Sequence, residues 1–162
     1  MFEWRRFEAP GDVSCLIVAG DAGIRTIDFH GQAEASGREG VSNPLLRQAV
    51  DQLRAYFAGE LRNFDLALDM QGTGFQKRVW QEVRNIPYGR TCSYKFVAAA
   101  IGAPTAVRAV GAANGRNPIP IVVPCHRVIG AGGSLVGYGG GLPLKRFLLD
   151  LEMRHGRLFQ EA

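Results

Sequence analysis

The chain has 162 residues, enough for one domain of ordinary size or for two small lobes that share a core. Its hydrophobic fraction of 46% can fill an interior, yet no apolar run is long enough to span a membrane and the first residues lack the apolar stretch of a signal peptide, so we expect a soluble, cytoplasmic protein. The net charge is +4, and its distribution along the chain says more than its sum.

The first part of the chain reads as a small sheet. Residues 13–18 and 24–29 are β-branched, apolar runs, and the turn residues 20–23 between them predict a hairpin. Residues 31–41 are polar and rich in glycine, which predicts a loop.

A helix follows the predicted hairpin. Asn43 and Pro44 are typical of a cap and a first helical position, apolar residues then recur at helical spacing, and Gly59 ends the pattern. Residues 66–68 form a short extended piece, and residues 71–74 are the best boundary between two lobes. We therefore predict an α/β lobe over residues 1–71 and a second domain over residues 72–162.

The second domain reads as mainly helical. Apolar residues recur at helical spacing from a cap at Thr73 or Gly74 to a turn at residues 87–89. Ser93 can cap a second, shorter helix that ends at Gly102, and residues 105–113 form a third. Two short helices joined by a turn that contains glycine are the outline of a helix-turn-helix.

Two interpretations of the third helix stay open. Its residues are small except for Arg108, so it could lie close against a nucleic-acid groove. Small residues also allow a helix to pack closely against another helix. A last helix begins at Pro143, and Glu152 lies at its end.

Positive charge is concentrated in one segment. Residues 1–70 carry 7 Lys and Arg against 11 Asp and Glu, whereas residues 71–127 carry 8 against Glu82 alone, a net charge of +7. Such a cluster is often a solvated face, but a basic segment behind an acidic lobe favours a polyanionic partner, namely nucleic acid.

The cysteines point to a free thiol. Cys15, Cys92 and Cys125 form neither a disulfide framework nor a metal motif, so we expect no metal and no cofactor. An odd, sparse number of thiols fits a reducing compartment.

Cys125 stands in the most informative stretch of the chain. It follows Pro124 and a short apolar run at residues 119–123, which reads as a buried strand, and it precedes His126 and Arg127. A free thiol has a pKa of about 8.5, and a nearby base or cation is the usual way to activate it. A direct contact between Cys125 and His126 requires the chain to turn after Pro124, or a water to bridge them. The alternative is that Cys125 is a small core residue.

Several of these segments share one pattern with a known family. The matching residues are Phe75-Gln76-Lys77-Arg78-Val79-Trp80, Ile86-Pro87-Tyr88-Gly89, Ser93-Tyr94, Arg108-Ala109-Val110-Gly111, Ala113-Asn114-Gly115 with Asn117-Pro118, residues 121–128, and Gly137-Tyr138 with Gly140-Gly141. Together they resemble the O6-alkylguanine-DNA alkyltransferases, also called methylated-DNA–protein-cysteine methyltransferases.

The resemblance implies an α+β protein in which a small sheet-plus-helix lobe, ribonuclease-H-like, precedes a helical domain with a helix-turn-helix and the reactive cysteine. It implies irreversible, single-turnover transfer of the alkyl group of O6-alkylguanine in double-stranded DNA to Cys125, with the nucleotide flipped out of the stack. O4-alkylthymine is a second candidate substrate. We expect a monomer, with cooperative binding along DNA left open.

The resemblance also implies roles for single residues near the thiol. His126 would act as base through a bridging water, Glu152 would orient that imidazole, and Tyr94 would donate a hydrogen bond to the departing base. The alternatives are a carboxylate at a helix end for Glu152 and a packing role for Tyr94.

Four further residues are expected around the flipped base. Tyr138 and the backbone N–H of Gly139 would line its pocket, and the Val128 carbonyl would bind the exocyclic amine. Asn117 would tie the third helix to the active-site strand, or else form an Asx-turn before Pro118.

We expect contacts with DNA from one further set of residues. Arg108 would fill the space that the flipped nucleotide leaves, from a helix in the minor groove, where recognition is largely independent of sequence. The full set is Arg108, Ser93, Ala109, Arg116 and Arg127.

Two functions of other classes compete with this one. A helix-turn-helix regulator would bind a defined sequence as a dimer and would need no thiol. A thiol hydrolase or redox enzyme would turn over repeatedly. The thiol next to a base, and the lack of signs of a symmetric dimer, argue against the regulator.

Overall fold

The chain divides into two compact units, Met1–Gln71 and Gly72–Ala162. The computed structural model describes the backbone of residues 1–31 and 37–161, and the side chains of these residues up to 156. It has the expected α+β composition. Within the described residues, no helix combines the length and the apolar character needed to cross a bilayer.

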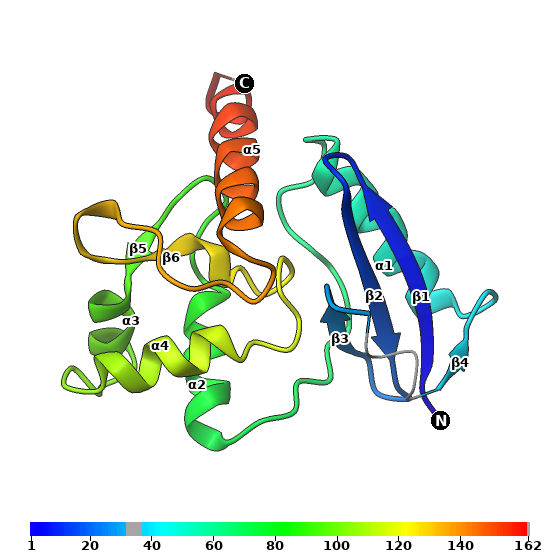
Figure 1. Ribbon diagram of the computed structural model, residues 1–162, viewed down its shortest axis with the longest axis horizontal. Coiled ribbons are helices and arrows are strands. Elements are labelled where there is room, and N and C mark those ends of the chain that lie inside the picture. Colours follow the sequence, from blue (N-terminus) through cyan, green and yellow to red (C-terminus); the bar gives the residue numbers. More distant parts are fainter. Residues whose placement is uncertain (32–36, 162) are drawn as a thin grey trace. The chain divides into compact units, whose positions relative to one another are not determined.

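A four-stranded sheet forms the first unit, in the order β3-β2-β1-β4 (Figure 1). Its strands are β1 (Glu3–Ala9), β2 (Val13–Ala19), β3 (Ile24–Asp28) and β4 (Arg38–Glu39). The β2–β3 hairpin that the sequence predicted is confirmed. β1 pairs antiparallel with β2 along its whole length, whereas β4 pairs parallel with β1.

The loop predicted over residues 31–41 needs one correction. Arg38 and Glu39 form β4, because Glu3 at the start of β1 binds the Arg38 guanidinium at 2.8 Å and the two backbones run side by side. Residues 32–36 lie outside the described residues. The strand β1 was not predicted either, because most of its side chains stay in contact with solvent and only Phe7 is buried.

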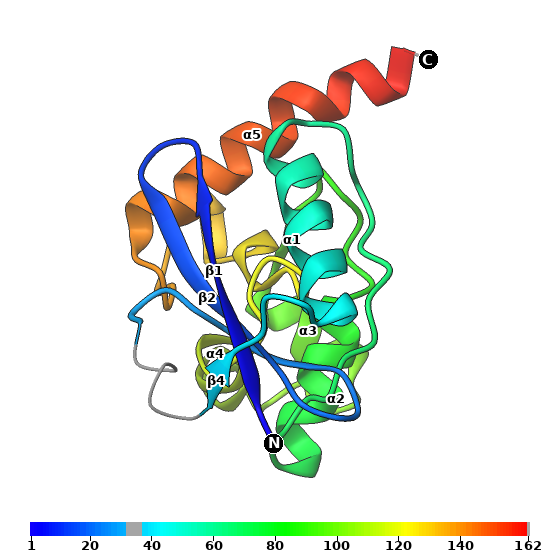
Figure 2. The ribbon, with the colours of Figure 1, turned by 90° about the vertical axis from the view of Figure 1, so that its right-hand side faces the viewer.

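The helix α1 (Pro44–Phe57) packs against β1 and β2 (Figure 2). The Asn43 side chain accepts hydrogen bonds from the backbone N–H groups of Leu45 and Leu46, at 2.9 and 3.2 Å, which confirms the predicted cap. The apolar face of α1 is buried over Leu46, Ala49, Val50, Leu53, Tyr56 and Phe57.

The second unit is mostly helical (Figure 1). Its elements are α2 (Gly74–Val83), β5 (Cys92–Ser93), α3 (Tyr94–Ala100), α4 (Val107–Gly115), β6 (Val128–Ile129) and α5 (Leu142–Glu161). Thr73 caps α2 and Ser93 caps α3 through their side chains. Gly102 adopts a φ of +77° after α3, the left-handed conformation that glycine accepts most easily.

A buried hydrogen bond joins α4 to α2. Ala113 lies on the inner face of α4, and its carbonyl accepts a hydrogen bond of 2.8 Å from the Trp80 indole of α2. The small residues of α4 allow this close approach. They therefore serve helix packing, while Arg108 and Ala109 on the same helix remain exposed.

The predicted strand over residues 119–123 is wrong. The backbone folds into a turn, in which the Val123 N–H donates to the Ile119 carbonyl at 2.9 Å. Pro118 and Pro120 carry no N–H to donate to a sheet, and Ile121 adopts a φ of +74°, a conformation that strains a β-branched residue. Buried apolar residues in a tight turn give the same sequence pattern as a buried strand.

The position of Glu152 also differs from the prediction. It lies within α5, which continues to Glu161, rather than at a helix end. The helix macrodipole therefore has little effect on this carboxylate, and its interactions must come from side chains and from neighbouring backbone.

Replacing Trp80 with Phe should remove the bond to the Ala113 carbonyl and leave a gap between α2 and α4. We expect the free energy of unfolding, measured by urea denaturation, to fall by about 1–3 kcal/mol. Trp4→Phe is the matched control, because the indole N–H of Trp4 has no hydrogen-bond partner among the described residues. Equal losses in the two variants would show that the hydrogen bond contributes nothing.

Candidate active site

Cys125 opens a short 3-10 turn, Cys125–Arg127, directly after Pro124. The Arg127 N–H donates to the Pro124 carbonyl at 2.9 Å, so the chain turns where the sequence argument required it. Successive side chains of a 3-10 turn point in different directions, and among the described residues no hydrogen bond joins the thiol of Cys125 to the ring of His126. A water between them would complete the contact.

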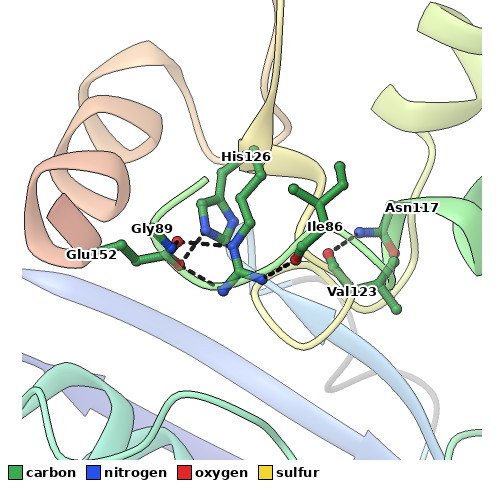
Figure 3. A network of polar contacts seen from close by, with 7 residues as sticks. Ile86, Gly89, Asn117, Val123, His126 and Glu152 are labelled. Carbon is green, nitrogen blue, oxygen red and sulfur yellow. Dashed lines mark hydrogen bonds and ion pairs between the residues drawn. The ribbon is translucent and has the colours of Figure 1, made fainter. Parts of the chain in front are cut away.

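His126 is fully buried and bound to Glu152. Its Nε2 lies 2.6 Å from a carboxylate oxygen of Glu152 (Figure 3). Burial lowers the pKa of His126 despite the carboxylate beside it, so the ring is neutral at neutral pH. A neutral ring that donates through Nε2 keeps its lone pair on Nδ1, which is buried and has no partner among the described residues.

The position of Arg127 differs from the prediction. It was expected to contact DNA, but only 6% of its surface is exposed. Its guanidinium donates to both carboxylate oxygens of Glu152, at 2.8 and 3.0 Å, and to the Ile86 carbonyl at 2.7 Å. Its five N–H donors in a fixed fork suit this buried site, and none of this requires nucleic acid.

Glu152 is the centre of this group (Figure 3). Besides His126 and Arg127, the backbone N–H of Gly89 donates to it at 3.2 Å. Burial alone would raise the pKa of this carboxyl, but His126 and Arg127 outweigh burial and hold its pKa far below the usual range. The carboxylate is therefore ionised, which fits the orienting role expected for it.

The thiol of Cys125 is protonated at neutral pH. Burial raises its pKa to about 11, and the Asn117 side chain and the charge of Lys145 oppose this rise only in part. Because Arg127 is committed to Glu152, it does not supply the cation that the sequence argument considered. For the thiol to react at neutral pH a base must take its proton, and Nδ1 of His126, the next residue in the chain, is a buried lone pair without a partner among the described residues.

Asn117 holds the turn that carries the nucleophile. Its amide donates to the Val123 carbonyl at 2.8 Å (Figure 3). Its side-chain oxygen accepts from the Ile119 N–H at 3.0 Å. The two interpretations of Asn117 therefore hold together, as an Asx-turn and as a link between α4 and the turn. It lies outside the set of residues that line the adjacent cavity.

A cavity of about 530 Å³ is lined in part by Asn114, whose amide donates to the Cys125 carbonyl at 3.2 Å. It brings together four residues expected at the site, Tyr94, Arg108, Tyr138 and Gly139. The full lining is Tyr94, Val107, Arg108, Gly111, Asn114, Gly115, Val136, Gly137, Tyr138 and Gly139. The Tyr94 hydroxyl donates to the Val136 carbonyl at 3.1 Å, and burial raises the pKa of this phenol. A neutral phenol is a proton donor, as the expected role requires.

Lys145 is a site residue that the sequence analysis missed. It is fully buried, and its ammonium donates to the carbonyls of Val128 and Val136, at 2.8 and 3.0 Å. It thereby joins β6 to the loop that lines the cavity, and it holds the Val128 carbonyl in place. The available signal was its position one turn before Leu148 and two turns before Glu152, on the buried face of α5.

The remaining residues that were predicted to contact DNA differ in their exposure to solvent and in their hydrogen bonds. Arg108 and Ala109 are exposed on α4, and Arg116 is exposed at its C-terminal end. Ser93 is half-buried, and its hydroxyl accepts a hydrogen bond from the Phe96 N–H at 3.0 Å as the cap of α3. No group of three or more His, Cys, Asp or Glu in the described part of the chain is placed to hold a metal ion.

Glu152→Gln should destabilise this unit, because it leaves the Arg127 charge buried without a counter-charge. We expect the free energy of unfolding at pH 7 to fall by about 3–5 kcal/mol in urea denaturation. The pKa of Glu152 is lowered on folding, so its contribution is present above the ordinary carboxyl pKa of about 4.3 and is lost as pH falls further. The Gln variant should lack this part of the acid sensitivity.

Asp150→Asn is the matched control, since Asp150 is an exposed carboxylate on the same helix. We expect a change in unfolding free energy within about 0.5 kcal/mol. A similar small effect of Glu152→Gln would contradict the view of Glu152 as the buried counter-charge.

Comparisons with known proteins cover both units. Residues 74–154 match the family model of the 6-O-methylguanine DNA methyltransferase DNA-binding domain, and residues 14–70 match that of the ribonuclease-like domain of the same proteins. A methylated-DNA–protein-cysteine methyltransferase of Mycolicibacterium paratuberculosis is 52% identical over 158 residues, which are 96% of this chain and 94% of the relative.

Solved structures agree with the sequence comparison. The O6-methylguanine methyltransferase of Mycobacterium tuberculosis has a TM-score of 0.88 and 46% identity, over 96% of this chain and 94% of that one. A structure of the OGT protein of the same organism in complex with DNA has a TM-score of 0.85 and 48% identity, with 94% of both chains covered. With relatives matched over nearly their whole length, the chain belongs to the O6-methylguanine DNA methyltransferase family.

Proposed function

We propose that this protein repairs O6-alkylguanine in double-stranded DNA by transferring the alkyl group to Cys125, once per molecule. The observation that carries the proposal is that Cys125 precedes a neutral, oriented imidazole and is bonded through its carbonyl to Asn114, which lines a cavity of about 530 Å³. The family to which the chain belongs, and a relative solved with DNA, support the same substrate.

The chemical step needs only residues of this chain. The thiol proton passes through a water to Nδ1 of His126, and the sulfur attacks the alkyl carbon as the bond from that carbon to O6 breaks. The electron pair stays on the purine, which takes up one proton in balance with the proton that the thiol released, and the base remains in the strand as guanine. Tyr94 stabilises the developing negative charge by donating a hydrogen bond, for which it must release the Val136 carbonyl.

The product explains why each molecule acts once. The sulfur of an S-alkylcysteine is a poor leaving group, so neither a water nor a side chain displaces it and the alkyl group stays on Cys125. The proposal therefore includes no turnover and no cofactor.

DNA access requires that the damaged nucleotide leave the stack, which costs a few kcal/mol. Arg108 is exposed on α4 and also lines the cavity, so it can enter the duplex at the place the nucleotide leaves. The exposed Ala109 and Arg116 would lie along the same groove, and the basic segment would contact phosphates. Ser93 would contribute through the start of α3.

We also propose that the protein acts in the cytoplasm as a monomer. All three cysteines are free thiols, and Cys125 must stay reduced in order to react. Minor-groove binding without sequence preference needs no two-fold symmetry in the protein.

Incubation with duplex DNA that contains O6-methylguanine should add one methylene equivalent to the protein in intact-mass analysis, and peptide mapping should place it on Cys125. Cys125→Ala should bind the same DNA and gain no mass. Cys92→Ser is the matched control for thiol loss, and it should react like the wild type. With excess substrate, a second equivalent of product per protein would contradict single turnover and favour a hydrolase.

Arg108→Ala should separate repair in duplex from the chemistry at sulfur. We expect the rate of transfer from duplex DNA to fall about tenfold or more, because the extrahelical nucleotide loses the side chain that fills its place. Reaction with the free base O6-benzylguanine should change by less than about twofold. Equal losses with both substrates, measured by mass spectrometry over time, would rule out this role for Arg108.

A further inference from the structure

Lys145 is a buried cation without a counter-charge. Its side chain extends from α5 and has no exposed surface. The ion pairs of the second unit join Glu152 to His126 and to Arg127, and none in the described part of the chain includes Lys145. Burial lowers the pKa of the ammonium, because a charge away from water is costly. A cation kept in this position without an anion calls for an explanation.

Hydrogen bonds hold the ammonium and leave one of its donors over. Nζ donates to the carbonyls of Val128 and Val136, at 2.8 and 3.0 Å, and two such acceptors favour the charged form. An ammonium carries three N–H groups. The third has no hydrogen-bond partner among the described residues. Lys145 can therefore still stabilise one negative charge.

Packing alone does not account for a lysine at this position. A methionine has a similar length and would fill the same space without the cost of burying a charge. Binding the Val128 and Val136 carbonyls is a second possible role, but a neutral amide could donate to both at a lower desolvation cost. The feature left to explain is the charge itself.

Cys125 is the acidic group with which this charge interacts. The Val128 N–H donates to the Cys125 carbonyl, and the Val128 carbonyl accepts from Lys145, so a single residue links the two. The ammonium acts against the rise that burial causes in the pKa of the thiol. Glu152 lies two turns along α5 and is bound by Arg127 instead.

The proposed reaction creates a negative charge at Cys125. When the thiol proton passes through a water to His126, the imidazolium is neutralised by Glu152, whereas the sulfur becomes an anion. Tyr94, the other titratable side chain on which the charge of Cys125 acts, is a neutral phenol. An interaction that is stronger in the transition state than in the resting protein speeds the reaction.

We propose that the ammonium of Lys145 is the counter-charge of the Cys125 thiolate. The charge pair forms as the proton leaves the sulfur, and it is lost when the sulfur takes the alkyl group. Lys145 keeps its own proton throughout, so the bonds made and broken in the transfer are unchanged. The inference rests on the proposed function and adds an electrostatic residue to it.

Lys145→Met should slow methyl transfer from duplex DNA that contains O6-methylguanine. We expect the rate at saturating DNA, followed by intact mass, to fall about hundredfold or more, as for the loss of a group that stabilises charge in a transition state. Arg146→Met is the matched control, because Arg146 is an exposed cation on the same helix, and its rate should stay within about twofold of the wild type.

Lys145→Gln separates the charge from the hydrogen bonds. Its amide can still donate to the two carbonyls, so a role in holding them would restore much of the rate. We expect this variant to remain about tenfold or more below the wild type, because it carries no charge. Recovery to within about threefold would overturn the inference.

A double-mutant cycle tests the charge pair apart from the reaction. Cys125→Asp and Cys125→Asn differ mainly in the negative charge. At pH 7, the urea midpoint of Cys125→Asp should lie further below that of Cys125→Asn when Lys145→Met is also present, by about 1 M or more. The loss of the carbonyl hydrogen bonds cancels, because both Lys145→Met proteins share it.

Equal differences with and without Lys145→Met would overturn the inference and leave the proposed function intact. If both double variants are unfolded, Lys145→Gln takes the place of Lys145→Met in the cycle. A wild type that gains no methyl group from the duplex would overturn the proposed function instead, and the cycle would still measure the interaction of Lys145 with a charge at position 125.

Discussion

The buried charge of Glu152 is the constraint on which the second unit depends. A carboxylate away from water is costly unless opposite charge and hydrogen bonds surround it, and here Arg127, His126 and the Gly89 N–H do so. Arg127 is bound in turn to the Ile86 carbonyl. One carboxylate thus fixes α5, the turn that carries the nucleophile and the segment that follows α2, and each of these elements brings residues to the site.

The same charge balance sets the protonation of the reacting groups. Because Arg127 neutralises Glu152, the carboxylate orients His126 without making it a cation, and burial keeps the ring neutral. Burial raises the pKa of the Cys125 thiol to about 11, and the Asn117 side chain and the Lys145 charge oppose this rise only in part, so the thiol stays protonated. In the proposed mechanism, the reactivity of Cys125 therefore depends on a base, a water and a bound substrate being present together.

Local signals in the sequence predicted the helices well. They predicted some residues of the site correctly and misplaced or missed others. Caps such as Asn43 and Ser93 and the 3.6-residue periodicity gave the helices almost as the structure has them. The turn over residues 119–123 was predicted as a strand, because a buried turn and a buried strand both appear in the sequence as a short run of apolar residues. Arg127 was assigned to DNA and Lys145 was overlooked for one reason: a count of charges along the chain cannot show which cations are buried. Cys125 and His126 were found because their chemistry is visible in adjacent residues.

The two buried acceptors without partners suggest what this arrangement is built to do. Within the described residues, His126 Nδ1 and Asn114 Oδ1 are both covered and both unpaired. Nδ1 belongs to His126, the residue after Cys125, and Oδ1 belongs to Asn114, whose amide donates to the Cys125 carbonyl. Interiors pair nearly all such atoms, since an unpaired acceptor lowers stability. The proposed mechanism supplies a partner for one of them, because the water that links His126 to Cys125 donates a hydrogen bond to Nδ1.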